Sequence, residues 1–342
     1  MSPSAAPPPA ERAADFTGRR VLVTGGSGFI GRHIVSELRG AGAYVRVADL
    51  RPHPDRGVAI VQGDLADAAV REDALRGGID SIVHLAAVTS VLRSLEAPEL
   101  TYRTNVGATA GLLEAAREAG ATALVFASTN AVTGEMQSPK ISESSTLAPL
   151  TPYGATKAAA EMLMAAYTAS YGLRCTCLRL TNVYGPGMQA KDSIVARLMR
   201  AIRLGTTFEI YGDGRQLRDY VHVSDVAAAV RLGLVREDWH GPVVIGTGTS
   251  LSVLEVLDAV RAVSGAELHV EHGPAKPGEM PAVIVDPTRA RHAGWSPRFS
   301  LARGLTGVWE EWSRAQVEGA SAWQPAPAPT PESAPTSGPA PP

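Results

Sequence analysis

The chain has 342 residues, of which 45% are hydrophobic and 19% are charged, and its formal net charge is −2. This size allows two ordinary domains, or one domain with a smaller companion, and a sizeable core. Nothing in the charge balance points to nucleic acid as a partner, and no apolar run approaches the ~18 residues that a membrane span needs. We therefore expect neither a nucleic-acid nor a membrane partner.

The two ends of the chain are rich in proline and alanine, and we predict disordered tails over 1–17 and 318–342. The first of these has no apolar stretch of the kind found in secretory signals. The two cysteines, Cys175 and Cys177, lie on one predicted strand and are expected to be buried thiols rather than a disulfide or metal pair. These features predict a reducing cytoplasm and no metal site.

The first predicted element is a strand over 21–24, which runs into a glycine cluster and then into an apolar-periodic helix over 29–39. Gly25, Gly28 and Gly31 have the spacing of a dinucleotide-binding loop. In such a loop the first glycine allows the sharp turn, and the second lets the backbone approach a pyrophosphate. The third lets helix and strand pack closely, with the helix N-terminus facing the anion.

The second predicted strand covers 44–48 and ends at Asp49, about 20 residues beyond the glycines, where an acid binds a ribose 2′-hydroxyl. An ordinary glycine-rich turn is the alternative reading, and Asp49 makes it the weaker one. A carboxylate repels the 2′-phosphate of NADP, so Asp49 favours NAD. The nearby cation of Arg51 weakens that preference.

Strands and helices continue to alternate along the chain. Further strands are predicted at 59–61, 81–84, 123–127 and 175–179, and helices at 67–75, 98–118, 153–171 and 194–204. Short apolar strands separated by helices form a parallel sheet covered on both faces, which predicts a doubly wound α/β fold. Ligands of such folds bind at the carboxyl ends of the strands. The residues that follow the predicted strands are Gly25, Asp49, Asp64, Ala86, Ser128 and Asn182.

Loops rich in glycine and proline break the rest of the chain into shorter elements. Two regular helices are predicted there, over 223–235, opened by Ser224 and Asp225, and over 252–263, with Ser252 as its N-cap. We expect a dinucleotide-binding domain over 18–182 and a smaller, partly interleaved C-terminal substrate lobe over 183–317.

Tyr153 and Lys157 are four residues apart on a predicted helix and therefore share a face. A lysine ammonium near a phenol favours the phenolate and lowers its pKa. Such a tyrosine takes a proton from an alcohol while a nicotinamide takes the hydride. A plain surface pair is the alternative, and the position after a dinucleotide loop favours the catalytic role. Ser128 and Thr129 end the preceding strand, where a hydroxyl bonds either the reacting substrate oxygen or backbone groups.

From about Arg20 to Trp312 the chain resembles the extended short-chain dehydrogenases/reductases of the NAD-dependent epimerase/dehydratase family. The resemblance rests on ordered motifs: Thr24-Gly-Gly-Ser-Gly-Phe-Ile-Gly31, Asp64-Leu65, His84-Leu-Ala-Ala87, Asn105-Val-Gly107, Ser128-Thr129, Tyr153-x-x-x-Lys157, Arg179-Leu-Thr-Asn-Val-Tyr-Gly-Pro186, Tyr211-Gly-Asp-Gly214 and Arg218-Asp-Tyr-Val-His222. It implies a Rossmann fold and NAD as the cofactor.

The resemblance also implies roles for individual residues. Thr129 matches the catalytic Ser/Thr of the family, Tyr153 its general base, and Lys157 the residue that holds the nicotinamide ribose. Asp64 and Leu65 would contact the adenine, and Ala86, Ala87 and Asn105 would line the cofactor channel. The full set of expected cofactor-binding residues is Gly25, Gly28, Phe29, Ile30, Gly31, Asp49, Asp64, Leu65, Ala86, Ala87, Asn105, Ser128, Tyr153 and Lys157.

Four residues are expected to bind the substrate: Asn182, Tyr211, Arg218 and Lys276. By resemblance, Asn182 and Arg218 hold a substrate pyrophosphate, and the planar guanidinium of arginine suits that task. A surface ion pair with Asp213 or Asp219 is the alternative for Arg218.

Two positions depart from the family pattern. Lys276 stands where members commonly have arginine, which keeps the charge and loses the bidentate geometry. Val132-Thr-Gly134 replaces a frequent Val-Tyr-Gly and is expected to reshape the sugar pocket.

The residues after Thr129 indicate the reaction. Dehydratases of the family place Asp-Glu there to expel water, whereas this chain has Asn130 and Ala131, which cannot transfer protons. A glutamate that nucleotide-sugar decarboxylases favour nearby is absent too. We therefore expect 4-epimerisation of a nucleotide sugar, with a UDP-sugar favoured. The alternatives are a net dehydrogenase or reductase of a nucleotide sugar or related polyol, and a non-catalytic NAD-binding sensor. The resemblance also implies a homodimer, formed through helices in the 98–118 and 153–171 regions.

Overall fold

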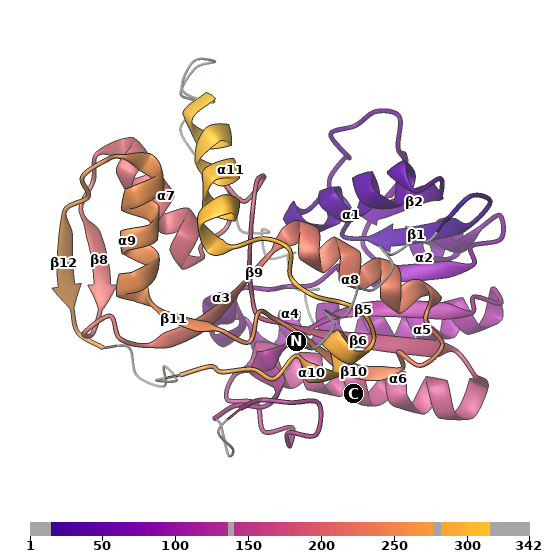
Figure 1. The fold of residues 1–342 in the computed structure, drawn as a ribbon. Coiled ribbons are helices and arrows are strands. Elements are labelled where there is room, and N and C mark those ends of the chain that lie inside the picture. Colours follow the sequence, from indigo (N-terminus) through magenta and orange to yellow (C-terminus); the bar gives the residue numbers. More distant parts are fainter. Residues whose placement is uncertain (1–14, 136–139, 276–281, 315–342) are drawn as a thin grey trace, which may run out of the picture.

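The computed structural model describes residues 15–135, 140–275 and 282–314. Its centre is a seven-stranded sheet with the strand order β10-β6-β5-β4-β1-β2-β3, and every neighbouring pair is parallel (Figure 1). The strands are β1 (Arg20–Thr24), β2 (Tyr44–Asp49), β3 (Ala59–Gln62), β4 (Ser81–His84), β5 (Ala123–Thr129), β6 (Arg174–Leu180) and β10 (Gly241–Ile245). The first six confirm the predicted strands.

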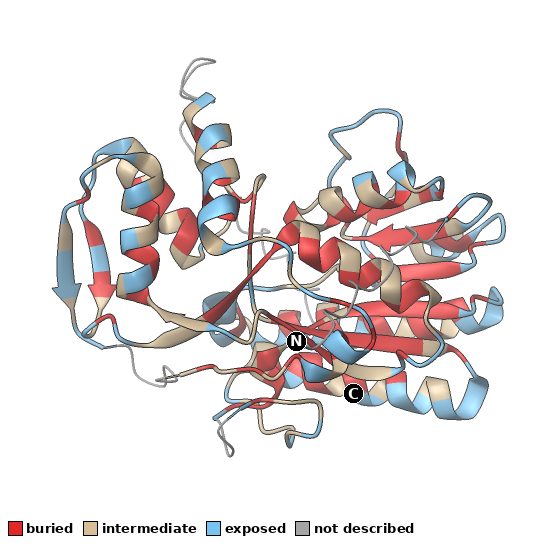
Figure 2. Cartoon of the chain, viewed as in Figure 1, coloured by how far each residue is buried: buried red, intermediate tan, exposed pale blue. Residues whose placement is uncertain are grey.

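Helices cover both faces of this sheet. Alternate strand residues point to opposite sides, and the apolar side chains on each side pack against helices. Val21 and Val23 of β1 pack in one core with α1 (Phe29–Gly40) and α8 (Val223–Val235). Leu22 between them belongs to the opposite core, formed with α2 (Ala68–Leu75), α5 (Ala108–Glu118) and α6 (Pro152–Tyr171). Cys175 and Cys177 are buried free thiols in this second core, as predicted. The central strands β1, β4, β5 and β6 are accordingly mostly buried, whereas the edge strand β3 has no buried residue (Figure 2).

A smaller lobe packs around its own core (Figure 1). It contains a three-stranded sheet, β11-β9-β7, and a two-stranded sheet, β12-β8. Its elements are β7 (Asn182–Tyr184), α7 (Ile194–Leu204), β8 (Phe208–Tyr211), β9 (Leu217–His222), β11 (Ser250–Ser252), α9 (Val253–Ser264), β12 (Val270–Gly273) and α11 (Leu301–Arg314). Between them, α8 and β10 return to the large sheet, and α10 (Thr288–His292) packs on β10. The lobe is therefore interleaved with the first domain.

Two helices of the C-terminal half begin at residues whose side chains cap the helix N-terminus. Ser252 caps α9 in a reciprocal capping box with Glu255, as its position predicts. Helix α8 has the predicted bounds, with Ser224 and Asp225 in its first turn, and its N-cap is His222, whose imidazole accepts from the backbone N–H of Ser224. The Asp225 carboxylate accepts from backbone N–H groups at 298 and 299.

The predicted helix over 98–118 is confirmed as a continuous helical stretch, but it contains a π-helical turn. It consists of α4 (Pro98–Tyr102), a π-helical turn η1 (Arg103–Gly107) and α5, and a short helix α3 (Val91–Glu96) precedes it. The π turn coincides with Asn105, whose side chain bonds to two other segments. Apolar periodicity could not predict this π turn, because the turn depends on contacts of Asn105 with distant segments.

Several predictions concern residues at or beyond the limits of the described chain. Residues 1–14, 315–342 and Lys276 lie outside it. Phe16, assigned to the N-terminal tail, is fully buried in the core shared with α1 and α8, so the ordered chain begins earlier than predicted. Among the described residues, no helix is long and apolar enough to cross a membrane, and no group of three metal-ligating side chains occurs.

Candidate active site

The glycine-rich turn joins β1 to α1 and leaves no room for a side chain at Gly25 or Gly31. Gly25 has φ +69°, and a Cβ there would lie 2.8 Å from the backbone nitrogen of Ala86. A Cβ on Gly31 would overlap the carbonyl of Gly25. Helix α1 begins after Gly28 without a side-chain cap, so no described side chain occupies the backbone N–H groups of its first turn. This cradle fits a dinucleotide pyrophosphate.

Asp49 lies beside this turn, where the adenosine ribose of a dinucleotide is expected. Its carboxylate accepts hydrogen bonds from the backbone nitrogens of Ser27 and Arg51, both at 3.0 Å. These bonds fix the carboxylate at the end of β2 and keep its charge near the loop. The arrangement supports the predicted preference for NAD over NADP.

The other predicted cofactor residues occupy different environments. Asp64 follows β3, and its carboxylate accepts from the backbone of Ala66 at 2.9 Å. Leu65 and Phe29 are buried in cores, Phe29 in that of the smaller lobe. Ile30 is half-buried, as are Ala86 and Ala87 after β4. The side chains of Phe29 and Leu65 pack in these cores, so a cofactor would contact chiefly the backbone of these two residues.

Thr129, Tyr153 and Lys157 come together where β5 ends and α6 begins. Tyr153 is the second residue of α6, whose N-cap Thr151 accepts from the backbone of Gly154. The side chains of Thr129 and Tyr153 are hydrogen-bonded to each other. One turn along α6, the Lys157 ammonium donates to the Ala127 carbonyl at 2.8 Å. The structure thus assembles the hydroxyl, phenol and amine predicted to be catalytic.

Burial, rather than charge, controls the titration of this group. It raises the pKa of Tyr153 to about 12, and the hydrogen bond with Thr129 offsets only part of the rise. Burial lowers the pKa of Lys157 to about 7. We expected Lys157 to lower the pKa of Tyr153, and in this structure it does not. The buried lysine loses its own proton readily, so it is a weak source of positive charge for the phenol. Above pH 7 the protonated form of Lys157 is progressively lost.

A buried ion pair supports the same helix and was missed by the sequence interpretation. Glu161, one turn after Lys157, pairs with Arg179 of β6 at 2.8 Å, and both side chains are almost fully buried. The Ser128 hydroxyl donates to Glu161. The Ser128 hydroxyl thus faces the ion pair, and its contact with a cofactor stays a prediction. The spacing of Lys157 and Glu161 was visible in the sequence, but their distant partner was not.

Asn105 is committed to protein contacts. Its amide exchanges hydrogen bonds with the backbone of Val88, at 2.8 Å and 3.0 Å, and donates to the Thr156 hydroxyl at 3.0 Å. The residue thus ties the segment after β4 to helix α6. Any effect of Asn105 on the predicted cofactor channel comes through the position of that segment.

The predicted substrate residues lie on the smaller lobe. Asn182 of β7 and Arg218 of β9 occupy adjacent strands, and the Asn182 amide donates to the Asp219 carbonyl at 3.0 Å. The Asp219 carboxylate accepts from groups at 181, 247 and 248, which anchors β9 beside Arg218. Tyr211 ends β8 in the other small sheet, with the Arg197 guanidinium 5.4 Å from its ring centre. The structure therefore places Asn182 and Arg218 on neighbouring strands and Tyr211 on a separate sheet.

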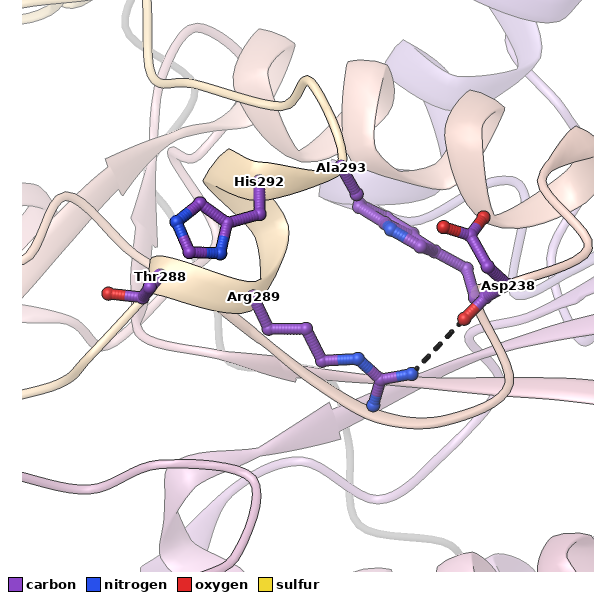
Figure 3. Close-up of a pocket in the computed structure, with 6 residues that line it drawn as sticks. Asp238, Thr288, Arg289, His292 and Ala293 are labelled. Carbon is purple, nitrogen blue, oxygen red and sulfur yellow. Dashed lines mark hydrogen bonds between the residues drawn. The ribbon is translucent and has the colours of Figure 1, made fainter.

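A surface hollow elsewhere has no relation to these residues (Figure 3). It lies between α10 and the loop before β10, and Trp239 and His292 help to line it. Arg289 crosses it and donates to the carbonyls of Asp238 and Pro242. Its guanidinium is used to hold the loop, and none of the predicted site residues lines the hollow.

The fold and the site together define a dinucleotide-dependent enzyme of the doubly wound class. The chain belongs to the NAD-dependent epimerase/dehydratase family, whose sequence profile matches residues 21–246. The cofactor of this family is NAD.

Individual relatives perform more than one reaction. The chain is 36% identical to a dTDP-glucose 4,6-dehydratase of Streptomyces niveus, over 86% of this chain and 93% of the relative. It is 36% identical to a Thermus thermophilus UDP-glucose 4-epimerase solved with NAD, with a TM-score of 0.82 over 86% of this chain and 99% of that one. It is 39% identical to MoeE5 solved with UDP-glucuronic acid and NAD, with a TM-score of 0.81 over 87% and 99%.

Proposed function

We propose that the protein is an NAD-dependent 4-epimerase of a nucleotide sugar, with a UDP-sugar as substrate. The observation that carries this proposal is the hydrogen-bonded pair of Thr129 and Tyr153 beside Lys157, at the carboxyl edge of the sheet. The relatives solved with UDP-sugars support the substrate class. Asn182 and Arg218 supply the polar groups that would hold the diphosphate.

In this reaction the deprotonated form of Tyr153 takes the proton of the sugar 4-hydroxyl, and Thr129 hydrogen-bonds the same oxygen. NAD, when bound, supplies the nicotinamide carbon that accepts the hydride from C4 and returns it. The 4-keto sugar turns in the pocket between the two transfers, and Tyr153 gives its proton back. Lys157 orients the nicotinamide ribose. Proton and hydride are both returned, so the cofactor is unchanged.

The residues after Thr129 favour epimerisation over dehydration. Asn130 is buried, and its amide has no hydrogen-bond partner among the described residues. Neither it nor Ala131 can act as the acid or base that water loss requires. Net oxidation or reduction of a nucleotide sugar or related polyol uses the same groups and differs only in release of the reduced or oxidised cofactor. A non-catalytic NAD sensor would need neither Tyr153 nor Lys157.

A substrate panel separates these reactions. Purified protein with NAD is incubated with UDP-glucose, UDP-glucuronic acid, UDP-N-acetylglucosamine, and GDP- and dTDP-sugars. Products are resolved by chromatography while nicotinamide absorbance is followed. We expect one UDP-sugar to yield its 4-epimer without net NADH. Net NADH with an oxidised sugar would replace the epimerase proposal by the dehydrogenase, and a product lacking water would identify a dehydratase.

We also propose a homodimer, formed through α4 and α6. These helices contact each other and expose large apolar side chains, with Tyr102 61% exposed and Met162 65% exposed. We expect Met162→Glu to convert the dimer into a monomer in sedimentation velocity at micromolar concentration. Leu204→Glu, at an equally exposed position on α7, is the matched control and should leave the dimer intact. A wild-type monomer would refute the proposal.

A further inference from the structure

His84, the last residue of β4, lies in the interior between two threonines. Its ring is 1% exposed. Nδ1 is 2.7 Å from the Thr24 hydroxyl, which ends β1 just before the glycine-rich turn. Nε2 is 2.9 Å from the Thr109 hydroxyl on α5. The imidazole therefore bridges the strand that carries the dinucleotide loop and the helix that follows the π turn.

The neighbouring hydrogen bonds determine which group is the donor and which the acceptor in each bond of His84. The Thr24 oxygen already accepts from the backbone nitrogens of Leu85 and Ala86, at 3.2 Å and 3.3 Å. Its own hydrogen therefore goes to Nδ1 of His84, which must be unprotonated. The Thr109 hydroxyl donates to the carbonyl of Asn105 at 2.6 Å, so its oxygen accepts from Nε2–H. The network requires the neutral Nε2–H tautomer.

The chain of bonds continues from Asn105 to the catalytic tyrosine. The Asn105 amide donates to the Thr156 hydroxyl at 3.0 Å, and that hydroxyl donates to the Tyr153 carbonyl at 2.8 Å. Buried side chains thus connect the end of β1 with the first turn of α6. The Asn105 amide also holds Val88, so the segment after β4 is fixed by the same group.

The surroundings keep the imidazole neutral. Burial, together with the positive charge of Lys157, lowers the pKa of His84 to about 3. The Phe126 ring stacks on His84 with centroids 5.6 Å apart, and the Lys157 ammonium is 4.4 Å from the same ring. A protonated imidazole would present two donors and could not accept from Thr24.

We propose that His84 is a positioning residue, which sets the Tyr153 end of α6 and the Val88 segment relative to the dinucleotide loop through one fixed tautomer. This proposal rests on the proposed role of Tyr153. His84 touches no reacting atom, and its effect is to hold the phenol where proton and hydride transfer coincide. A small displacement of a catalytic group costs up to about 100-fold in rate.

The tautomer can be tested without any assay of activity. Protein labelled with ¹⁵N-histidine is examined by NMR at pH 7, and His84 is assigned from the signal lost in His84→Gln. We expect an unprotonated Nδ1 and a protonated, slowly exchanging Nε2. A protonated Nδ1, or a charged ring, would overturn the proposal whatever reaction the enzyme performs.

Kinetics then test the positioning role on the sugar that the panel identifies. We expect His84→Leu and Thr109→Val each to lower kcat 10- to 100-fold with little change in KM, and the double variant to be no worse than His84→Leu. His84→Gln, which keeps one donor and one acceptor, should recover part of the loss. Val83→Ala opens a cavity at the adjacent position of β4 and should lower Tm without lowering kcat.

Two outcomes would contradict this role. Fully additive losses in the double variant would show that His84 and Thr109 do not act as one chain. Equal kcat losses in Val83→Ala and His84→Leu, at matched loss of Tm, would reduce the effect to stability alone. If the wild type turns over no sugar, the proposed function fails, while the NMR result still decides the state of His84.

Discussion

Tyr153→Phe is expected to lower the turnover of the nucleotide sugar by about 1,000-fold, within the range of roughly 10²- to 10⁴-fold for a positioned acid or base. The substitution removes only the hydroxyl that is hydrogen-bonded with Thr129. The half-buried ring of Tyr153 in the first turn of α6 is unchanged, so packing and NAD binding should be retained. Turnover is measured by product chromatography, and NAD binding by calorimetry.

Tyr167→Phe provides the matched control for this variant. Tyr167 lies on the same helix, and its hydroxyl donates to Glu114 at 2.9 Å, away from the proposed site. We expect turnover of Tyr167→Phe within about 2-fold of wild type, as for a surface change of less than about 0.5 kcal/mol. Wild-type turnover by Tyr153→Phe would refute the role of the phenol. Loss of activity accompanied by unfolding would be detected by circular dichroism.

Glu161→Gln is expected to lower the free energy of unfolding by about 3–5 kcal/mol, because it leaves the buried Arg179 without its counter-charge. In the native protein the two side chains are 3% and 6% exposed. Arg179 also donates to the carbonyls of Ser142 and Glu143, so it cannot swing to solvent without breaking those bonds. Urea denaturation followed by circular dichroism measures the change.

An ion pair on the protein surface is the control for the buried pair of Glu161 and Arg179. Glu310→Gln removes an ion pair between Glu310 and Arg314, two largely exposed side chains, and should cost less than about 1 kcal/mol. Glu161→Leu combined with Arg179→Met should be more stable than either single change, because no buried charge is left unpaired. An equal free energy of unfolding for Glu161→Gln and wild type would contradict this prediction. The ion pair would then position the two side chains without stabilising the fold.

The sequence alone could predict the parts of this fold that depend on local pattern. The first six strands of the large sheet and most of its helices follow from apolar periodicity and glycine placement, and in the smaller lobe Ser252 marks the start of α9. The triad of Thr129, Tyr153 and Lys157 was found because its members sit at recognisable places relative to strands and helix starts.

What could not be predicted depends on contacts between distant segments. The π turn at Asn105 reflects bonds to Val88 and Thr156, which no helical period contains. The partner of Glu161 is 18 residues away on β6. The raised pKa of Tyr153 arises from burial, whereas spacing suggested only the neighbouring charge of Lys157. In each case a polar group is governed by what packs around it.

The return of α8 and β10 to the large sheet has a consequence for how the protein is made. On the ribosome, the first 182 residues emerge with one face of β5 and β6 uncovered, because α8 contributes the opposing apolar residues. The outer edge of β6 also stays open until β10 arrives after residue 240. The first part of the smaller lobe, from β7 to β9, is thus synthesised while the dinucleotide fold is incomplete. Nascent chains of this protein pass through a stage at which chaperones would find an exposed strand edge and an apolar surface.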